Sequence, residues 1–174
     1  ADDGSVFFRI ASWPAYGALA RLDPEAMRVG ERVESDEYSK DDVRDFVLWK
    51  AAKAGEPSWE TAVGTGRPGW HLECSAMSMA HLGPSFDIHT GGIDHREIHH
   101  PNEIAQNQAH ECSDHSGASI WMHNNFLIDR GGKMSKSSGE FLRLQLLIDK
   151  GYHPLAYRLL CLQAHYGENQ SQTE

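Results

Sequence analysis

D-I-H-T-G-G-I-D, residues 87–94, is the stretch that decides the expected fold, because it reads as a short strand running into a Gly-Gly turn. In an open α/β sheet, ligands bind at the carboxyl ends of the strands. Gly91 and Gly92 would let a ligand approach the backbone closely, and Asp94 could accept hydrogen bonds from ribose hydroxyls. A plain turn would have the same composition. The stretch alone therefore leaves a nucleotide site and an ordinary turn open.

The segments around this turn alternate between helical and strand patterns. Helix, strand, helix, strand, loop and helix is the order expected of an α/β fold with crossover helices. Two strands are too few for such a sheet, so we expect the missing strands to precede residue 1. The segment 54–69, rich in Gly and Pro, reads as a connection. After residue 69, the expected helices are 70–82, 100–112, 142–150 and 154–164, and the expected strands are 86–89 and 120–128. Nearer the start, residues 6–10 are expected to form a strand and residues 15–29 to be helical, with an interruption at Asp23-Pro24.

The composition indicates a folded chain without a membrane segment. The 174 residues are 40% hydrophobic and carry a net charge of −9, so the chain is a poor non-specific binder of nucleic acid. Cys74, Cys112 and Cys161 are odd in number and widely spaced, which favours a reduced, cytoplasmic setting over a disulfide framework. No apolar run approaches ~18 residues, and the start lacks the features of a secretory signal. The chain begins without Met, so we expect a piece of a longer protein.

Nine of the eleven histidines lie in the middle of the chain, and the densest cluster is H-H-P-N-E, residues 99–103. His99 and Glu103 are four residues apart, so a helix would place them on one face. Cys74 on the preceding helix could add a thiolate, and a Cys, His and Glu set suits zinc better than magnesium. Two alternatives remain open. His99 and Glu103 could be a surface pair beside a small core cysteine, or His71 and Cys74 could be the ligand pair.

K-M-S-K-S, residues 133–137, lies in a loop rich in Gly and Ser after the second expected strand. The loop is not a P-loop, because G-x-x-x-x-G-K-[ST] does not fit it. Lys133 and Lys136 could instead close over phosphates as point charges. A solvated basic loop would contain the same two lysines, although Met134 between them is harder to explain as solvated surface.

Taken together, these segments resemble the cysteinyl-tRNA synthetase family within the class I aminoacyl-tRNA synthetases. K-M-S-K-S matches the signature loop of class I without a mismatch. The family's usual F-P-H-H-E-N-E reads E-I-H-H-P-N-E here, where Pro101 replaces a glutamate that is not assigned as a ligand. The matching stretches are D-G-S-V-F-F-R-I (3–10), D-F-V-L-W-K-A-A-K (45–53), G-R-P-G-W-H-L-E-C-S-A-M-S (66–78), D-I-H-T-G-G-I-D (87–94), H-H-P-N-E-I-A-Q (99–106) and L-C-L-Q-A-H-Y (160–166).

The resemblance implies an α/β chain that forms the second half of a Rossmann-like class I catalytic domain. Residues 1–64 would be an α+β connective insertion, residues 65–141 the second half of the nucleotide-binding fold with the KMSKS loop, and residues 142–174 the start of a helical stem-contact region. The family's His-x-Gly-His signature, its fourth zinc ligand (a cysteine) and its anticodon-binding region are not in this sequence. We therefore expect a piece that is inactive alone, from a protein that is monomeric when intact.

The resemblance also implies a reaction, in which cysteine and ATP (with Mg²⁺) give cysteinyl adenylate and the cysteine passes to the 3′ end of tRNA(Cys). One zinc ion per subunit would be held by Cys74, His99 and Glu103. Trp70, which spacing alone leaves as either core or an aromatic wall beside the metal, matches the tryptophan that closes over bound cysteine. The catalytic residues would be Lys133 and Lys136, the ATP site Lys136, Gly91, Gly92 and Asp94, and the signature loop Lys133, Met134, Ser135, Lys136 and Ser137.

Other functions remain possible for such a chain. The cysteine ligase of mycothiol synthesis resembles the synthetases and also activates cysteine with ATP, although E-C-S-A-M, residues 73–77, favours the synthetase. A non-catalytic zinc- or nucleotide-binding fragment is a second alternative. A zinc hydrolase is disfavoured, because the sequence has neither H-E-x-x-H nor an obvious general base beside the expected metal.

Overall fold

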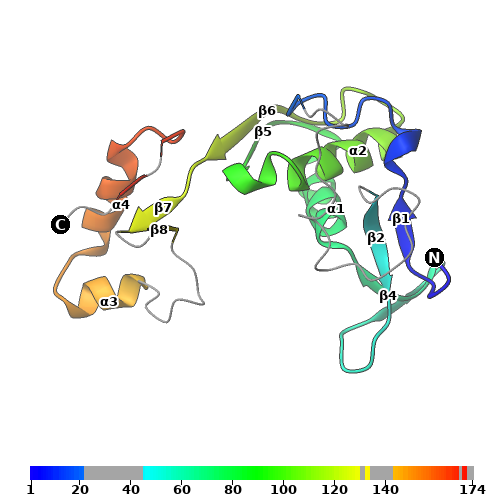
Figure 1. Ribbon diagram of the computed structural model, residues 1–174, viewed down its shortest axis with the longest axis horizontal. Helices are drawn as coiled ribbons and strands as arrows, with labels where there is room; N and C mark the ends of the chain where they lie inside the picture. Colours follow the sequence, from blue (N-terminus) through cyan, green and yellow to red (C-terminus); the bar gives the residue numbers. More distant parts are fainter. Residues whose placement is uncertain (22–44, 130–131, 134–142, 169, 172–174) are drawn as a thin grey trace. The chain divides into compact units, whose positions relative to one another are not determined.

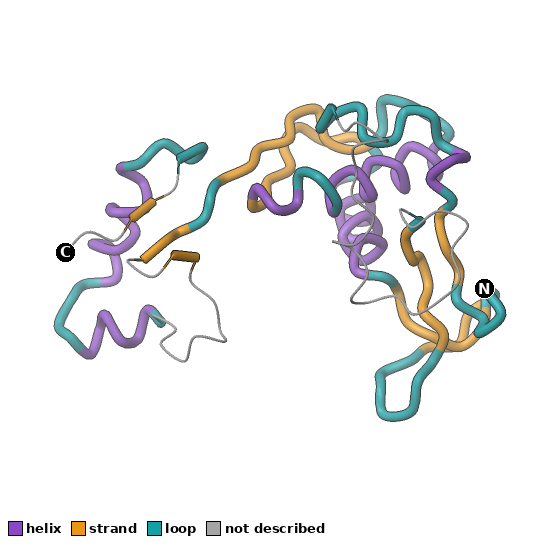
Figure 2. The backbone as a smooth tube through the Cα atoms, in the orientation of Figure 1, coloured by secondary structure: helices purple, strands orange, loops and turns teal. Residues whose placement is uncertain are grey.

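The computed structural model describes residues 1–21, 45–129, 132–133, 143–168 and 170–171 (Figures 1 and 2). The chain forms two compact units, which are described separately. Unit 1 comprises Ala1–His89 and Asp94–Trp121, and unit 2 comprises Thr90–Ile93 and Met122–Glu174. Both helices and strands are present, as expected for an α/β chain.

Unit 1 contains a four-stranded antiparallel sheet in the order β1-β2-β4-β3. The central strand β2 carries the apolar sequence F-V-L-W and pairs with β1 on one side and β4 on the other. The segment 54–69, predicted as a connection, instead contains a hairpin in which Trp59 pairs with Gly66. The strands are β1 (Val6–Phe8), β2 (Phe46–Ala51), β3 (Trp59–Thr61) and β4 (Gly64–Pro68).

Two helices of unit 1, α1 (Trp70–Leu82) and α2 (His99–Glu111), pack against each other (Figure 1). The bounds of α1 are those predicted from the sequence, and α2 begins one residue before its predicted start. α1 ends at Gly83, whose φ of 89° is accessible to glycine at little cost and whose N–H donates to the carbonyl of Met79. The boundaries predicted for these two helices are therefore largely confirmed, whereas residues 15–21, which were expected to be helical, form turns.

A two-stranded sheet pairs β5 (Ser85–Gly92) with β6 (Gly117–Asn124). Strand β5 is longer than the predicted 86–89, so Gly91 and Gly92 are its last residues and do not form a turn. The short 3-10 helix that follows, Ile93–His95, contains Asp94. The predicted strand 120–128 is divided between β6 and a separate strand, β7 (Leu127–Asp129).

Unit 2 contains a three-stranded sheet in the order β8-β7-β9, in which β7 pairs antiparallel with β8 (Gly132–Lys133) and parallel with β9 (Gln170–Ser171). Its helices, α3 (Leu144–Asp149) and α4 (Pro154–Gln163), match the predicted helices to within two residues. No helix in the described ranges is both long enough and apolar enough to cross a bilayer.

The apolar core of unit 1 is small, whereas α2 is buried despite its polar sequence. Ile10, Phe46 and Ala105 form the centre of the core. Among the buried polar side chains of α2, Asn102 accepts a hydrogen bond from the hydroxyl of Tyr16 at 2.5 Å. Buried polar side chains are costly unless they are paired, so a polar helix inside unit 1 indicates a functional site. The buried residues of α2 are His99, His100, Pro101, Asn102, Glu103, Ala105, Gln106 and Asn107.

Gly69 connects the sheet of unit 1 to α1. Its N–H donates to the carbonyl of Leu48 in β2 at 2.8 Å, and its own carbonyl accepts the first hydrogen bonds of α1. A Cβ atom on Gly69 would lie 2.3 Å from the carbonyl oxygen of Val47, which is shorter than any van der Waals contact between these atoms. Strand β2 therefore fixes the point at which α1 begins.

Replacing Gly69 with Ala is expected to destabilise unit 1 by about 1–3 kcal/mol, because the new methyl group meets backbone atoms that cannot rotate away. The midpoint of urea unfolding measures this effect. Thr65→Ala, an exposed substitution in β4, the strand that precedes Gly69, is the control. Equal midpoints for the two variants would show that the close approach of Gly69 to β2 is not a constraint.

Candidate functional site

Cys74, His99 and Glu103, the three residues predicted to hold a metal, come together in unit 1. Cys74 lies on α1 and the other two on α2, and one ligand atom of each lies within 4.8 Å of the others. His99 is 4% exposed and Glu103 is 1% exposed, so they are not a surface pair. Sulfur, imidazole nitrogen and carboxylate oxygen are the donor atoms that zinc accepts in proteins. The three residues therefore fit a zinc ion.

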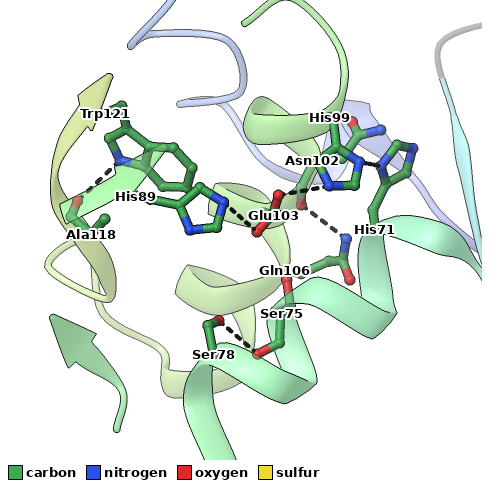
Figure 3. A network of polar contacts seen from close by, with 10 residues as sticks. All are labelled: His71, Ser75, Ser78, His89, His99, Asn102, Glu103, Gln106, Ala118 and Trp121. Atoms are coloured by element: carbon green, nitrogen blue, oxygen red, sulfur yellow. Dashed lines mark hydrogen bonds and ion pairs between the residues drawn. The ribbon is translucent and has the colours of Figure 1, made fainter. Parts of the chain in front are cut away.

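Glu103 is at the centre of this cluster, with an imidazole on each carboxylate oxygen (Figure 3). Oε1 lies 2.9 Å from Nε2 of His99, and Oε2 lies 3.3 Å from Nε2 of His89. Burial alone would raise the pKa of Glu103, but the contacts with the two imidazoles outweigh it and lower the pKa from 4.5 to about 2. Glu103 is therefore a carboxylate at neutral pH.

One carboxylate oxygen of Glu103, Oε1, lacks a hydrogen-bond partner within the part of the chain that the structure describes. Oε1 is fully buried, and despite the nearby His99 it has no well-formed hydrogen bond among the described residues. A buried carboxylate oxygen without such a bond is energetically costly. The lone pairs of Oε1 are thus available to a cation at the point where Cys74 and His99 also meet.

Cys74 is partly buried on the side of α1 that faces His99 and Glu103. Its surroundings disfavour ionisation of the thiol. Burial raises the pKa of the Cys74 thiol, and the negative charges of Glu103 and Glu73 raise it further. A bound cation would reverse this preference, since metal ligation requires the thiolate and displaces its proton. Cys74 is therefore a thiol in the metal-free protein and is suited to become a thiolate ligand when a cation is bound.

A second group of ligand atoms shares Glu103 with the first. His89 of β5 and His100 of α2 place a ring nitrogen within the same 4.8 Å of a Glu103 oxygen and of each other. Their rings lie 4.8 Å apart, and both contact Trp121. The sequence analysis did not identify these two histidines as a site, because His100 is adjacent to His99 and should point to another face of the helix. The sequence signal that could have found them is the histidine-rich composition of residues 89–100.

Trp70 and His71, at the start of α1, lie against the ring of His99. The Trp70 ring centroid is 4.3 Å from that of His99, yet Trp70 is 57% exposed, so it is not an ordinary core residue. Nδ1 of His71 lies 2.7 Å from Nδ1 of His99. The rival prediction pairs His71 with Cys74, but neither ligand group of the described residues contains His71. His71 thus approaches the site through His99.

The residues predicted to bind ATP are only partly described. Gly91 and Gly92 are partly buried at the end of β5, and Asp94 is exposed in the following 3-10 helix. Lys133 is described only through its backbone, which ends β8. Met134, Ser135, Lys136 and Ser137 lie outside the described residues.

A separate pocket of about 520 Å³ lies on another face of α2. None of the residues predicted to bind a metal or ATP lines this pocket, because α2 contributes other positions to the pocket wall. Those positions, 101, 104, 105 and 108, recur at helical spacing and differ from 99 and 103. The pocket walls include Trp13, Tyr16, Pro101, Ile104, Gln108 and Trp121.

The chain is similar to the catalytic domain of one class of tRNA synthetases. The family model for the tRNA synthetases class I (C) catalytic domain matches residues 1–174. A cysteine–tRNA ligase of Novosphingobium aromaticivorans is 60% identical over 174 residues, which cover 94% of this chain and 34% of the relative. Those of Zymomonas mobilis and Koribacter versatilis are 55% and 50% identical, and the matches cover 94% and 95% of this chain but 32% and 33% of the relatives. The chain thus spans about a third of the length of the curated relatives it matches.

The charge of Glu103 predicts a specific acid sensitivity. Because the pKa of Glu103 in the folded chain lies below its ordinary value of 4.5, the ionised carboxylate stabilises the fold above pH 4.5. This contribution is lost as the pH falls from 4.5 towards 2. Glu103→Gln should therefore flatten the pH dependence of the unfolding free energy in that range, measured by denaturant unfolding with a chelator present. Glu97→Gln, at an exposed position, is the control, and parallel profiles for Glu103→Gln and the unchanged protein would contradict the prediction.

Proposed function

Because the chain belongs to the class I tRNA synthetase (C) catalytic-domain family, we propose that it is part of a cysteine–tRNA ligase. The reaction joins cysteine to ATP, giving cysteinyl adenylate and pyrophosphate, and then transfers the cysteine to the 3′ end of tRNA(Cys). The observation that carries the proposal is the convergence of the partly buried Cys74 with the buried His99 and Glu103 in one cluster. A site that offers a thiolate, an imidazole and a carboxylate to zinc suits a substrate recognised through sulfur.

Selection between cysteine and serine is the task that this cluster would perform. The two amino acids differ by a sulfur in place of an oxygen, which shape alone discriminates poorly. A zinc ion on Cys74, His99 and Glu103 would supply a preference for a soft thiolate that a serine hydroxyl cannot satisfy. Trp70, exposed beside His99, would cover the bound amino acid and exclude water from it.

Activation of the amino acid needs alignment and charge stabilisation more than proton transfer. The substrate carboxylate is already a nucleophile, so no general base is required. Lys133 and Lys136 of the KMSKS loop would stabilise the negative charge that grows on the phosphates in the transition state, with Mg²⁺ as the ATP counterion. The match to the signature loop supports these roles. Gly91 and Gly92, which have no side chains, would let the nucleotide approach the backbone closely, and Asp94 would accept hydrogen bonds from the ribose hydroxyls.

The wider setting of the chain follows from the same proposal. Residues 1–64 would be the connective insertion, residues 65–141 the second half of the nucleotide-binding fold, and residues 142–174 the start of the stem-contact region. The intact protein would be a cytoplasmic monomer. The relatives are about three times as long as this chain. We therefore assign the activity to the longer protein of which this chain would be a part.

Zinc content distinguishes between the two groups of metal ligands that share Glu103. Cys74→Ala should abolish binding of one zinc equivalent, because it removes the only sulfur ligand of the first group. Cys112→Ala, which removes an exposed cysteine, should leave zinc content unchanged. Metal analysis of the purified variants measures both. A full zinc equivalent in Cys74→Ala would move the site to His89, His100 and Glu103.

The activity prediction concerns the signature loop. Lys136→Ala should lower kcat for cysteine-dependent ATP–pyrophosphate exchange by roughly 10²–10³-fold, the usual cost of losing one transition-state donor. Lys150→Ala removes the same charge from an exposed position after α3 and serves as the control. Absence of cysteine-dependent exchange in the unchanged protein that carries this chain would refute the assignment. Transfer of cysteine to an amino-sugar acceptor in place of tRNA(Cys) would identify the mycothiol ligase instead.

A further inference from the structure

A short contact between two imidazoles lies directly behind the predicted metal ligand His99. Nδ1 of His71 and Nδ1 of His99 are 2.7 Å apart, and their ring centroids are separated by 4.7 Å. At this distance the two nitrogens share a hydrogen bond, so one of them carries the proton and the other accepts it. His71 lies on α1 and His99 on α2, so the bond also connects the two helices.

The other nitrogen of His99 determines which of the two imidazoles is the donor. In the metal-free protein, Nε2 of His99 lies 2.9 Å from the negatively charged carboxylate of Glu103. The attraction of that charge places the proton of the neutral imidazole on Nε2, although the contact lacks the geometry of a well-formed hydrogen bond. A neutral imidazole has one N–H and one lone pair. Nδ1 of His99 is then an acceptor, and Nδ1 of His71 is the donor.

Ligation through Nε2 of His99 reverses this arrangement. A metal ligand must offer its lone pair, so the Nε2 proton leaves to solvent and the proton of His99 must lie on Nδ1. The proton on Nδ1 of His71 moves across the hydrogen bond to Nδ1 of His99, and Nε2 of His71 takes up a proton in its place. Each imidazole keeps one proton, so the pair stays neutral while the hydrogen bond changes direction.

The position of His71 is fixed by rings other than that of His99. The His71 ring meets the buried Phe46 of β2 edge-to-face at 5.8 Å and stacks on Trp70 at 5.7 Å. The preceding Gly69 is held against β2 by its hydrogen bond to Leu48. A side chain held in this way keeps its nitrogen directed at His99 whether or not a cation is bound.

His95 provides an internal comparison. Its ring centroid is 4.9 Å from that of His99, almost the distance of His71, and it also contacts Trp70. The described contacts of His95 are ring contacts, without a hydrogen bond to His99. Loss of the His95 imidazole therefore removes packing against the ligand, whereas loss of the His71 imidazole removes packing and a hydrogen-bond partner.

We propose that His71 is a positioning residue for the metal ligand His99, whose ring orientation and Nδ1–H tautomer it holds by accepting a hydrogen bond. The inference rests on the proposed zinc site, and it adds a residue that does not contact the cation. Hydrogen-bond partners of ligating histidines typically change metal affinity by 10–100-fold when they are removed.

Zinc affinity tests the proposal in the protein that carries this chain, by competition with a chromophoric chelator. His71→Phe keeps an aromatic ring but removes the acceptor, and it should weaken zinc binding by roughly 10–100-fold. His71→Asn, whose side-chain oxygen can occupy the position of Nδ1, should restore most of the affinity. His95→Phe should bind zinc as the unchanged protein does. Equal affinities for His71→Phe and the unchanged protein would overturn the proposal.

A second measurement does not depend on any variant. Nitrogen-15 NMR of the imidazoles should show His99 protonated on Nε2 without zinc and on Nδ1 with zinc, and the opposite change on His71. A zinc-loaded protein in which His71 still carries its proton on Nδ1 would overturn the proposal even if His71→Phe failed to fold. If the unchanged protein bound no zinc, the zinc site would fail and this inference with it, whereas zinc binding without the tautomer change would overturn the inference alone.

Discussion

The buried carboxylate of Glu103 is the constraint on which the centre of unit 1 depends. A charge that is 1% exposed cannot be tolerated without compensation. Compensation comes from His99 one turn earlier on α2 and from His89 on β5. Cys74 on α1 faces the same carboxylate. Three elements must therefore be placed accurately around one side chain, which explains why α2 is buried although most of its residues are polar.

Local signals in the sequence were sufficient for the four helices after residue 69, but not for the helix expected from residue 15 onwards or for all of the strands. The glycine at 83 ends α1 where expected, since a positive φ is easily accessible to it. The segment 54–69 looked like a connection because glycine and proline have low strand propensity. It forms β3 and β4 because β2 offers a long-range antiparallel partner, which local composition does not reveal. Gly91 and Gly92 likewise extend β5, which pairs with the distant strand β6, instead of forming a turn.

The metal ligands could be predicted because their pattern is partly local. His99 and Glu103 are one helical turn apart, and Cys74 was added from chemistry and resemblance. The second group of ligands and the hydrogen bond behind His99 could not be predicted in this way. Helical periodicity separates a buried face from an exposed one, and α2 is buried around most of its circumference. Contacts on its other faces therefore depend on tertiary packing, which brings His89 from β5 and His71 from α1.

The direct attachment of α1 to the sheet has a consequence for how the chain can change length during evolution. Gly69 is bonded to β2 and is followed immediately by the residues that face His99. Each added residue turns a helix by about 100°, so an insertion at this junction would direct Trp70, His71 and Cys74 away from α2. Residues 52–58, by contrast, are exposed between β2 and β3. Insertions and deletions should thus accumulate in that loop and be absent from the junction, even though the two flank the same β3–β4 hairpin.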